Sequence, residues 1–158
     1  MRTSLVMLLA AVLAACGPST PEGTNSASTP APAATAPSGQ EMQARIAALA
    51  PPYNEASYDA GRRVFAQCRS CHTLDEGAGH RVGPNLHGVF GREAGTAAGF
   101  NYSPALRDAD FVWNAQQLDH WLQNPQTFLP GNRMAFAGVR DAAQRRDVIA
   151  YLMVETAD

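Results

Sequence analysis

Hydrophobic positions divide the chain into three stretches. Residues 5–15 form an apolar run, residues 17–40 carry almost no large apolar side chains, and apolar residues recur at helical spacing beyond residue 57. Apolar side chains three and four positions apart lie on one face of a helix. The pattern predicts helices over residues 57–68, over residues 114–122 and from residue 141 towards the C-terminus. Long loops join them, no strand run longer than four residues appears between their turn signals, and the predicted fold class is all-α.

Polar residues that favour helix starts precede each predicted helix. Ser57, Asn114 and Asp141 can each accept a hydrogen bond from a backbone N–H of the first turn. Pro125 prevents the second helix from continuing far. In the third helix, apolar residues at i, i+3 and i+4 predict one buried face.

The N-terminus has the features of an export signal. Arg2 precedes the apolar run, which at eleven residues is too short for the roughly 20 that cross a bilayer as a helix. A buried N-terminal helix is the alternative. Residues 13–16, Leu-Ala-Ala-Cys, look like the lipobox of bacterial lipoproteins, which implies cleavage before Cys16 and a lipid on its thiol. An ordinary signal peptide that happens to contain a cysteine is the competing interpretation.

The next segment is typical of a tether. Pro, Ala, Ser, Thr and Gly make up 21 of the 24 residues at positions 17–40, a composition that cannot bury enough apolar surface to offset the entropy of ordering. Residues 41–50 can form a short helix that Pro51 and Pro52 would end. We therefore predict a removed signal peptide at residues 1–15, an anchored flexible tether at 16–56 and a folded domain at 57–158.

Composition narrows the function classes. The 158 residues include 12 cationic and 14 acidic side chains, and every cation is arginine. No basic field of the kind that binds nucleic acid is present. Three cysteines cannot all pair with one another, so at least one has another role.

The chemistry is concentrated at residues 68–72, Cys-Arg-Ser-Cys-His, which match the c-type haem attachment pattern. Cys68 and Cys71, one turn apart, can add to the two vinyl groups on one edge of a porphyrin, and His72 then places its imidazole under the iron. A thioredoxin-like motif would need a strand–helix context, and a zinc site would need a second pair of ligands. An export signal also favours covalent haem.

A sixth iron ligand can be sought among the other methionines and histidines. Met7 lies in the signal, Met42 precedes the predicted domain, and Met153 falls on the last helix, where it is expected to fill the core. Met134 follows a Pro-Gly turn, which can present a side chain across a flat cofactor. His80 and His87 are expected to be structural, and His120 is expected at the surface.

From residue 57 to residue 156 the chain resembles the small class I mono-haem cytochromes c, the mitochondrial and bacterial c2-like group. The motifs that carry the resemblance surround CRSCH in a fixed order: Gly61 and Phe65, GPNLHGVFGR (83–92), GFNYSPAL (99–106), Trp113, NPQTFLPGNRMAF (124–136) and DVIAYL (147–152). The resemblance implies a cytochrome c fold in which the N- and C-terminal helices cross at Gly61 and long loops surround one haem. It also implies His72 and Met134 as iron ligands.

The same resemblance implies the surroundings of the haem. The Pro84 carbonyl would accept a hydrogen bond from His72, and the residues near the propionates and the haem edge would be Arg92, Tyr102, Trp113, Asn132 and Phe136. Asn132 stands where the family often has threonine. Trp121 stands where tyrosine is common near the methionine sulfur, and an indole N–H donates but cannot accept. The histidine at position 80 would join one loop to another.

The implied function is electron transfer rather than enzymatic catalysis. We expect a lipid-anchored carrier on the periplasmic side of a bacterial cell envelope. Its expected donor is a quinol-oxidising complex or dehydrogenase, and its expected acceptor a terminal oxidase, peroxidase or reductase. Two alternatives remain: a cytochrome subunit docked permanently on one dehydrogenase, and a haem enzyme or gas sensor whose sixth position opens.

Overall fold

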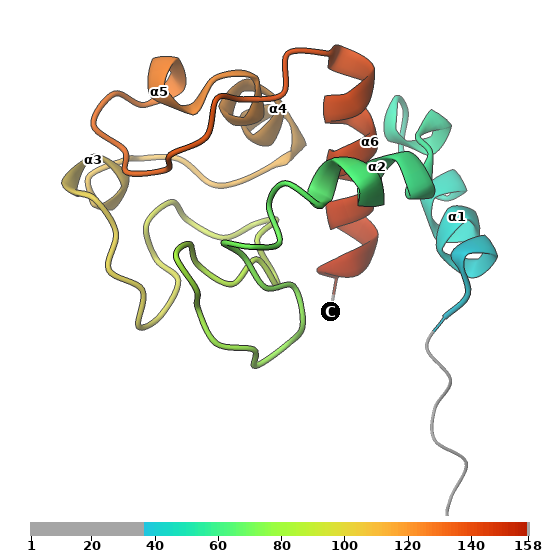
Figure 1. The fold of residues 1–158 in the computed structure, drawn as a ribbon, viewed down its shortest axis with the longest axis horizontal. Coiled ribbons are helices and arrows are strands. Elements are labelled where there is room, and N and C mark those ends of the chain that lie inside the picture. The colour runs from blue at the N-terminus through green and yellow to red at the C-terminus, as the bar shows by residue number, and fades with distance from the viewer. Residues whose placement is uncertain (1–36, 158) are drawn as a thin grey trace, which may run out of the picture. The chain divides into compact units, whose positions relative to one another are not determined.

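The computed structural model describes residues 37–157, and this part is helical with long loops (Figure 1). Its helices are α1 (Gly39–Ala47), the 3₁₀ helix η1 (Tyr53–Glu55), α2 (Tyr58–Phe65), α3 (Pro104–Arg107), α4 (Ala115–Gln123), α5 (Pro125–Phe128) and α6 (Ala142–Glu155). Across these described residues the only β pairing is one isolated bridge, Glu93 with Val112. The predicted all-α class is confirmed. The predicted signal, Cys16 and residues 17–36 lie outside the described residues.

The three predicted helix starts are confirmed. The side chains of Ser57, Asn114 and Asp141 each accept a hydrogen bond from the backbone N–H three residues further on, at 2.8–3.2 Å. Pro125 does end α4, but it also opens the short helix α5 at a first-turn position where its missing N–H costs nothing.

Helices α2 and α6 cross at close range, as the resemblance implied, and both line the interior of the domain (Figure 1). A methyl group on Gly61 would lie 2.2 Å from the carbonyl oxygen of Asp147 and 2.6 Å from the Cβ of Tyr151. Only a residue without a Cβ lets the two backbones come this near. Gly61 therefore sets the distance between the helices.

The predicted boundary at residue 57 is wrong, because the preceding segment is folded onto the domain. Helix α1 begins with a capping box at Ser38, and its Met42 and Ile46 are 4% and 0% exposed. They pack against Ala150 and Val154 of α6. Two large apolar residues on a short helix gave a weak signal in the sequence, and their partners lie about 100 positions away.

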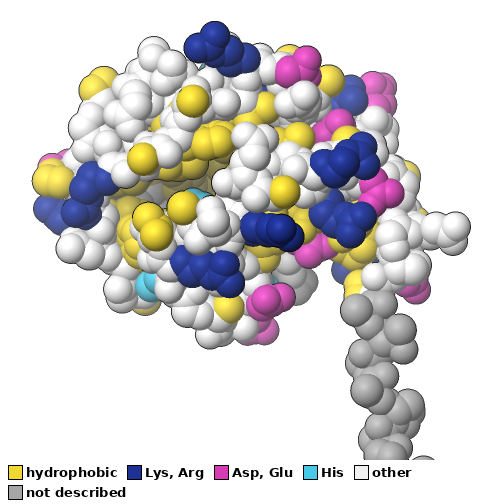
Figure 2. Space-filling model, in the orientation of Figure 1, with side chains coloured by type: hydrophobic (Ala, Val, Ile, Leu, Met, Phe, Trp, Pro, Cys, Tyr) yellow, Lys and Arg dark blue, Asp and Glu magenta, His cyan; other side chains and the backbone are white. Residues whose placement is uncertain are grey.

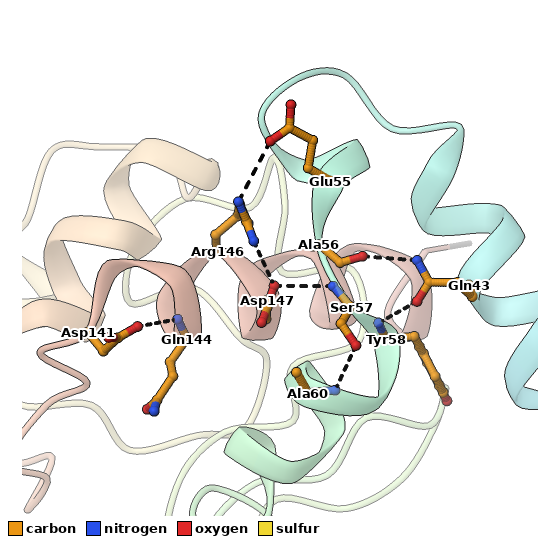
Figure 3. A network of polar contacts seen from close by, with 10 residues as sticks. All are labelled: Gln43, Glu55, Ala56, Ser57, Tyr58, Ala60, Asp141, Gln144, Arg146 and Asp147. Carbon is orange, nitrogen blue, oxygen red and sulfur yellow. Dashed lines mark hydrogen bonds and ion pairs between the residues drawn. The ribbon is translucent and has the colours of Figure 1, made fainter.

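A polar network fixes α1 and the start of α2 to α6 (Figure 3). The side-chain amide of Gln43 donates to the carbonyl of Ala56 at 2.9 Å and accepts from the backbone N–H of Tyr58 at 2.8 Å. The backbone N–H of Ser57 donates to the carboxylate of Asp147 at 3.2 Å. The folded domain therefore includes residues from Gly39 onward.

We expect Ile46→Ala to lower the free energy of unfolding by about 2 kcal/mol, because it removes a fully buried side chain between α1 and α6. Arg45→Ala, at an exposed position of the same helix, should change it little. Guanidinium chloride unfolding of both variants measures this. Equal midpoints for the two variants would mean that α1 is not docked.

Candidate functional site

A cavity of about 500 Å³ opens among α2, α4, α6 and the long loops, and its walls are mostly apolar. Figure 2 shows apolar side chains gathered in a hollow on one face, with arginine side chains at several points around it. Ten of the predicted site residues line this cavity: Cys68, Cys71, His72, Pro84, Arg92, Tyr102, Trp113, Trp121, Met134 and Phe136. The chain thus brings together residues that lie far apart in the sequence.

The CRSCH segment continues α2 by one turn. The backbone N–H groups of Cys71 and His72 donate to the carbonyl of Cys68 at 2.9 and 3.0 Å, and all three side chains face the cavity. Neither cysteine is in a disulfide. Burial, with a smaller contribution from Cys71, raises the pKa of the Cys68 thiol to about 11, so this thiol stays protonated at neutral pH.

Two alternatives for the cysteine pair lose support here. A redox-active dithiol works through a thiolate of lowered pKa, and the pKa of Cys68 is raised. Residues 37–157 contain no group of three or more His, Cys, Asp or Glu side chains placed to hold a metal ion, so a structural zinc site is also disfavoured.

The imidazole of His72 is held in one tautomer. Its Nδ1–H donates to the carbonyl oxygen of Pro84 at 2.7 Å, as predicted. Burial lowers the pKa of His72, while the hydrogen bond to Pro84 acts in the opposite direction. The neutral ring therefore keeps the lone pair on Nε2, which is the form that binds iron.

Gly83 also packs against this ring, a role that was not predicted from the sequence although the residue opens the GPNLHGVFGR motif. A Cβ at Gly83 would lie 2.3 Å from Cε1 of His72. The ring packs directly on the glycine backbone. The signal in the sequence was a glycine immediately before the residue that accepts the imidazole hydrogen bond.

We expect Gly83→Ala to push the imidazole out of position and to convert a large share of the haem protein to a high-spin form. Gly79→Ala is the matched control, since a Cβ there meets no atom within 4 Å and should leave the spectrum unchanged. The visible spectra of the two purified variants make the comparison. If Gly83→Ala kept a wild-type spectrum, the glycine would not position His72.

Met134 lines the cavity from a loop whose backbone is held by two amide side chains. Its N–H donates to Oδ1 of Asn132 at 2.9 Å, and its carbonyl accepts from Nε2 of Gln126 at 3.0 Å. Asn132 itself does not line the cavity. Its Nδ2 donates to the carbonyls of Pro125 and Leu129, both at 2.8 Å, so these two bonds occupy both hydrogens of the amide. The side chain turns towards α5 and has no donor left.

The remaining predicted residues line the cavity wall. The Arg92 guanidinium donates to the carbonyls of Asn85 and His87 at 3.1 and 3.2 Å, and the residue lines the cavity. Burial raises the pKa of Tyr102, against the opposing charge of Arg92, so the phenol remains a hydrogen-bond donor. The Trp113 and Trp121 rings pack edge to face, with their centroids 5.4 Å apart.

The other histidines and methionines of residues 37–157 do not line the cavity. His80 joins two loops, as expected: its Nε2–H donates to the Ala98 carbonyl at 2.8 Å, and its Nδ1 accepts from the Asn85 backbone at 3.0 Å. His120 is exposed. Met153 packs against the core, and Met42 of α1 is buried against α6.

Comparison of the sequence with known proteins identifies relatives of this chain. The family model for cytochrome c matches residues 58–154, so α1 and η1 precede the matched segment. Cytochrome c of Ulva intestinalis is 46% identical over 109 residues, covering 68% of this chain and 96% of that protein. Cytochrome c of Chlamydomonas reinhardtii is 47% identical over 98 residues, covering 61% and 88%, respectively.

The cavity fits the group that this family carries. Haem c is a flat, largely apolar macrocycle, and the cavity has apolar walls, two thiols on one turn and a neutral imidazole with a bare nitrogen. The chain belongs to the cytochrome c family, a family of haem-based electron carriers, and its haem c is bound covalently through thioethers to Cys68 and Cys71.

Proposed function

We propose that the protein carries single electrons with its haem iron ligated by His72 and Met134, and that a lipid on Cys16 tethers it to a membrane. When bound, the haem supplies a reversible one-electron change at iron. The chain contributes the ligands, an apolar surrounding and a fixed geometry. Imidazole and thioether ligation closes the iron and raises its reduction potential, which suits electron transfer better than peroxide or oxygen chemistry.

One observation carries the ligand assignment. Among the four histidines and three methionines between residues 37 and 157, only His72 and Met134 reach the cavity. Each is held by a hydrogen bond, His72 through the Pro84 carbonyl and Met134 through its own backbone N–H. No other side chain of these two kinds in the described part is available as a sixth ligand.

The residues around the ligands take their roles from chemistry and position. Tyr102 and Trp113 would donate to a propionate, and the charge of Arg92 would offset that carboxylate. Trp121 would lie near the Met134 sulfur. Phe136 would cover the edge at which electrons enter and leave, and the exposed side chain of Val82 also lines the cavity.

The proposal of a membrane tether is based on the sequence of residues 1–36 and on the place where the folded domain begins. No helix between residues 37 and 157 has the length and apolar character needed to cross a membrane. Val148 and Leu152 of α6 face the cavity, whereas Ala150 and Val154 face α1. Helix α1, the first described helix, therefore packs on the side of α6 turned away from the cavity.

The net charge of the chain favours partner encounter through a membrane tether over encounter guided by electrostatic attraction. Removal of residues 1–15 would leave eleven arginines against fourteen acidic residues, a net charge of −3. This net charge does not favour steering by a strong positive field, and attachment to the same membrane would raise the local concentration of partners instead. The partners we propose are a quinol-oxidising complex or dehydrogenase and a terminal oxidase, peroxidase or reductase on the periplasmic side.

The experiment compares wild-type protein in membranes with an exported, lipid-free Cys16→Ser form. The lipid-free form should have the same visible spectrum, react much more slowly with the membrane oxidase and show weak salt dependence. Equal rates for both forms would contradict the tether. Extraction of the wild type in a fixed ratio with a dehydrogenase would instead favour a permanently docked subunit.

A further inference from the structure

We infer that Gln126 is a positioning residue for Met134: its side-chain amide latches the loop that holds the Met134 sulfur at the iron. The inference rests on the proposed ligation of iron by Met134 and adds the device that keeps this ligand in place. Gln126 is an exposed residue on α5. Nothing about a glutamine at this position indicates a role near the iron from the sequence alone.

The latch is a closed set of hydrogen bonds around one buried amide. Nε2 of Gln126 donates to the carbonyl of Met134 at 3.0 Å and to Oδ1 of Asn132 at 3.2 Å. That same Oδ1 accepts from the N–H of Met134 at 2.9 Å. Both backbone polar groups of Met134 are therefore held, one by each amide side chain.

The rest of the loop has few other attachments. Along residues 130–138, all of them described, the backbone–backbone hydrogen bonds are Asn132 to Leu129 and Phe136 to Met134, and both are local. The side chain of Arg133 also donates to the carbonyl of Asn101. Gly131 and Gly138, with φ of +85° and +93°, flank the segment at backbone conformations that other residues rarely adopt. The two amides therefore carry most of the polar support of Met134.

The two amide side chains differ in burial and therefore in structural role. Asn132 is 7% exposed, and its bonds to the carbonyls of Pro125 and Leu129 build the loop itself. Gln126 lies outside and adds its two bonds after the loop is built. Its loss should leave the fold intact and release the ligand more often, which distinguishes a latch from a structural residue.

The test compares Gln126→Ala and Gln126→Glu with Gln116→Ala, a change at an exposed glutamine of α4. The readouts are the methionine-to-iron charge-transfer band of the ferric protein and the rate of carbon monoxide binding to the ferrous protein. Loss of one or two ordinary hydrogen bonds should raise the detached population, and with it this rate, about fivefold to twentyfold in Gln126→Ala. Gln116→Ala should match wild type, and thermal unfolding should stay cooperative in all three.

Gln126→Glu gives the sharper result, because glutamate has the shape of glutamine but its carboxylate cannot donate. It would face the oxygens of Met134 and Asn132 and should release the ligand at least as much as alanine does. If both variants bound carbon monoxide like Gln116→Ala while the wild type showed the methionine band, the latch would be wrong and the ligation would stand. A wild type without that band would overturn the ligation and the latch together.

Discussion

Leucine in place of Met134 is expected to lower the reduction potential and to let carbon monoxide bind ferrous iron rapidly. Leucine fills a similar volume but has no sulfur to donate to iron. Axial ligands set haem potentials over a range of roughly 0.8 V, and we expect a fall on the order of tenths of a volt. Redox titration followed at the haem bands, with and without carbon monoxide, measures both effects.

Met153→Leu is the matched control. Met153 lies on α6, packs against the core and does not line the cavity, so the same change there should alter neither the potential nor carbon monoxide binding. Equal behaviour of the two leucine variants would remove Met134 as the ligand.

Alanine in place of Gly61 is expected to lower the free energy of unfolding by about 3 kcal/mol, near the upper end for an overpacked core site. The added methyl would meet a backbone carbonyl oxygen at 2.2 Å, which cannot rotate away, so α2 and α6 would have to separate. The better helix propensity of alanine offsets only about 1 kcal/mol of this cost. Because Phe65 of α2 and Val148 of α6 both line the cavity, the haem spectrum should also change.

Gly39→Ala tests whether the effect comes from the crossing. Gly39 is also helical, and a Cβ there meets no atom within 4 Å, so the substitution should change stability by less than about 0.5 kcal/mol. Denaturant unfolding of both variants gives the comparison. A Gly61→Ala protein as stable as Gly39→Ala would show that the helices do not need glycine to approach.

Local signals predicted the main helices well. Ser57, Asn114 and Asp141 are short polar side chains that bond to their own first turn, so their structural role is visible within four residues of sequence. The docking of α1 was not visible in this way. Met42 and Ile46 are buried by α6, and nothing near them in the sequence indicates that partner.

The same distinction between local signals and distant contacts applies to the residues at the cavity. His72 and Cys71 belong to one short motif, and their placement follows from the turn after α2. The position of Asn132 depends on two carbonyls at α5 and its C-cap, and a resemblance to proteins with threonine does not indicate those contacts. Gln126 was missed because its role arises from a loop that folds back onto its helix.

The visible spectrum of the purified protein, ferric and ferrous, with and without carbon monoxide, tests the central claim most directly. We predict a low-spin spectrum with a methionine-to-iron charge-transfer band in the ferric form, and a ferrous spectrum that carbon monoxide does not change on mixing. A high-spin spectrum, or rapid carbon monoxide binding by the wild type, would contradict a closed His72 and Met134 site and would favour a haem enzyme or gas sensor.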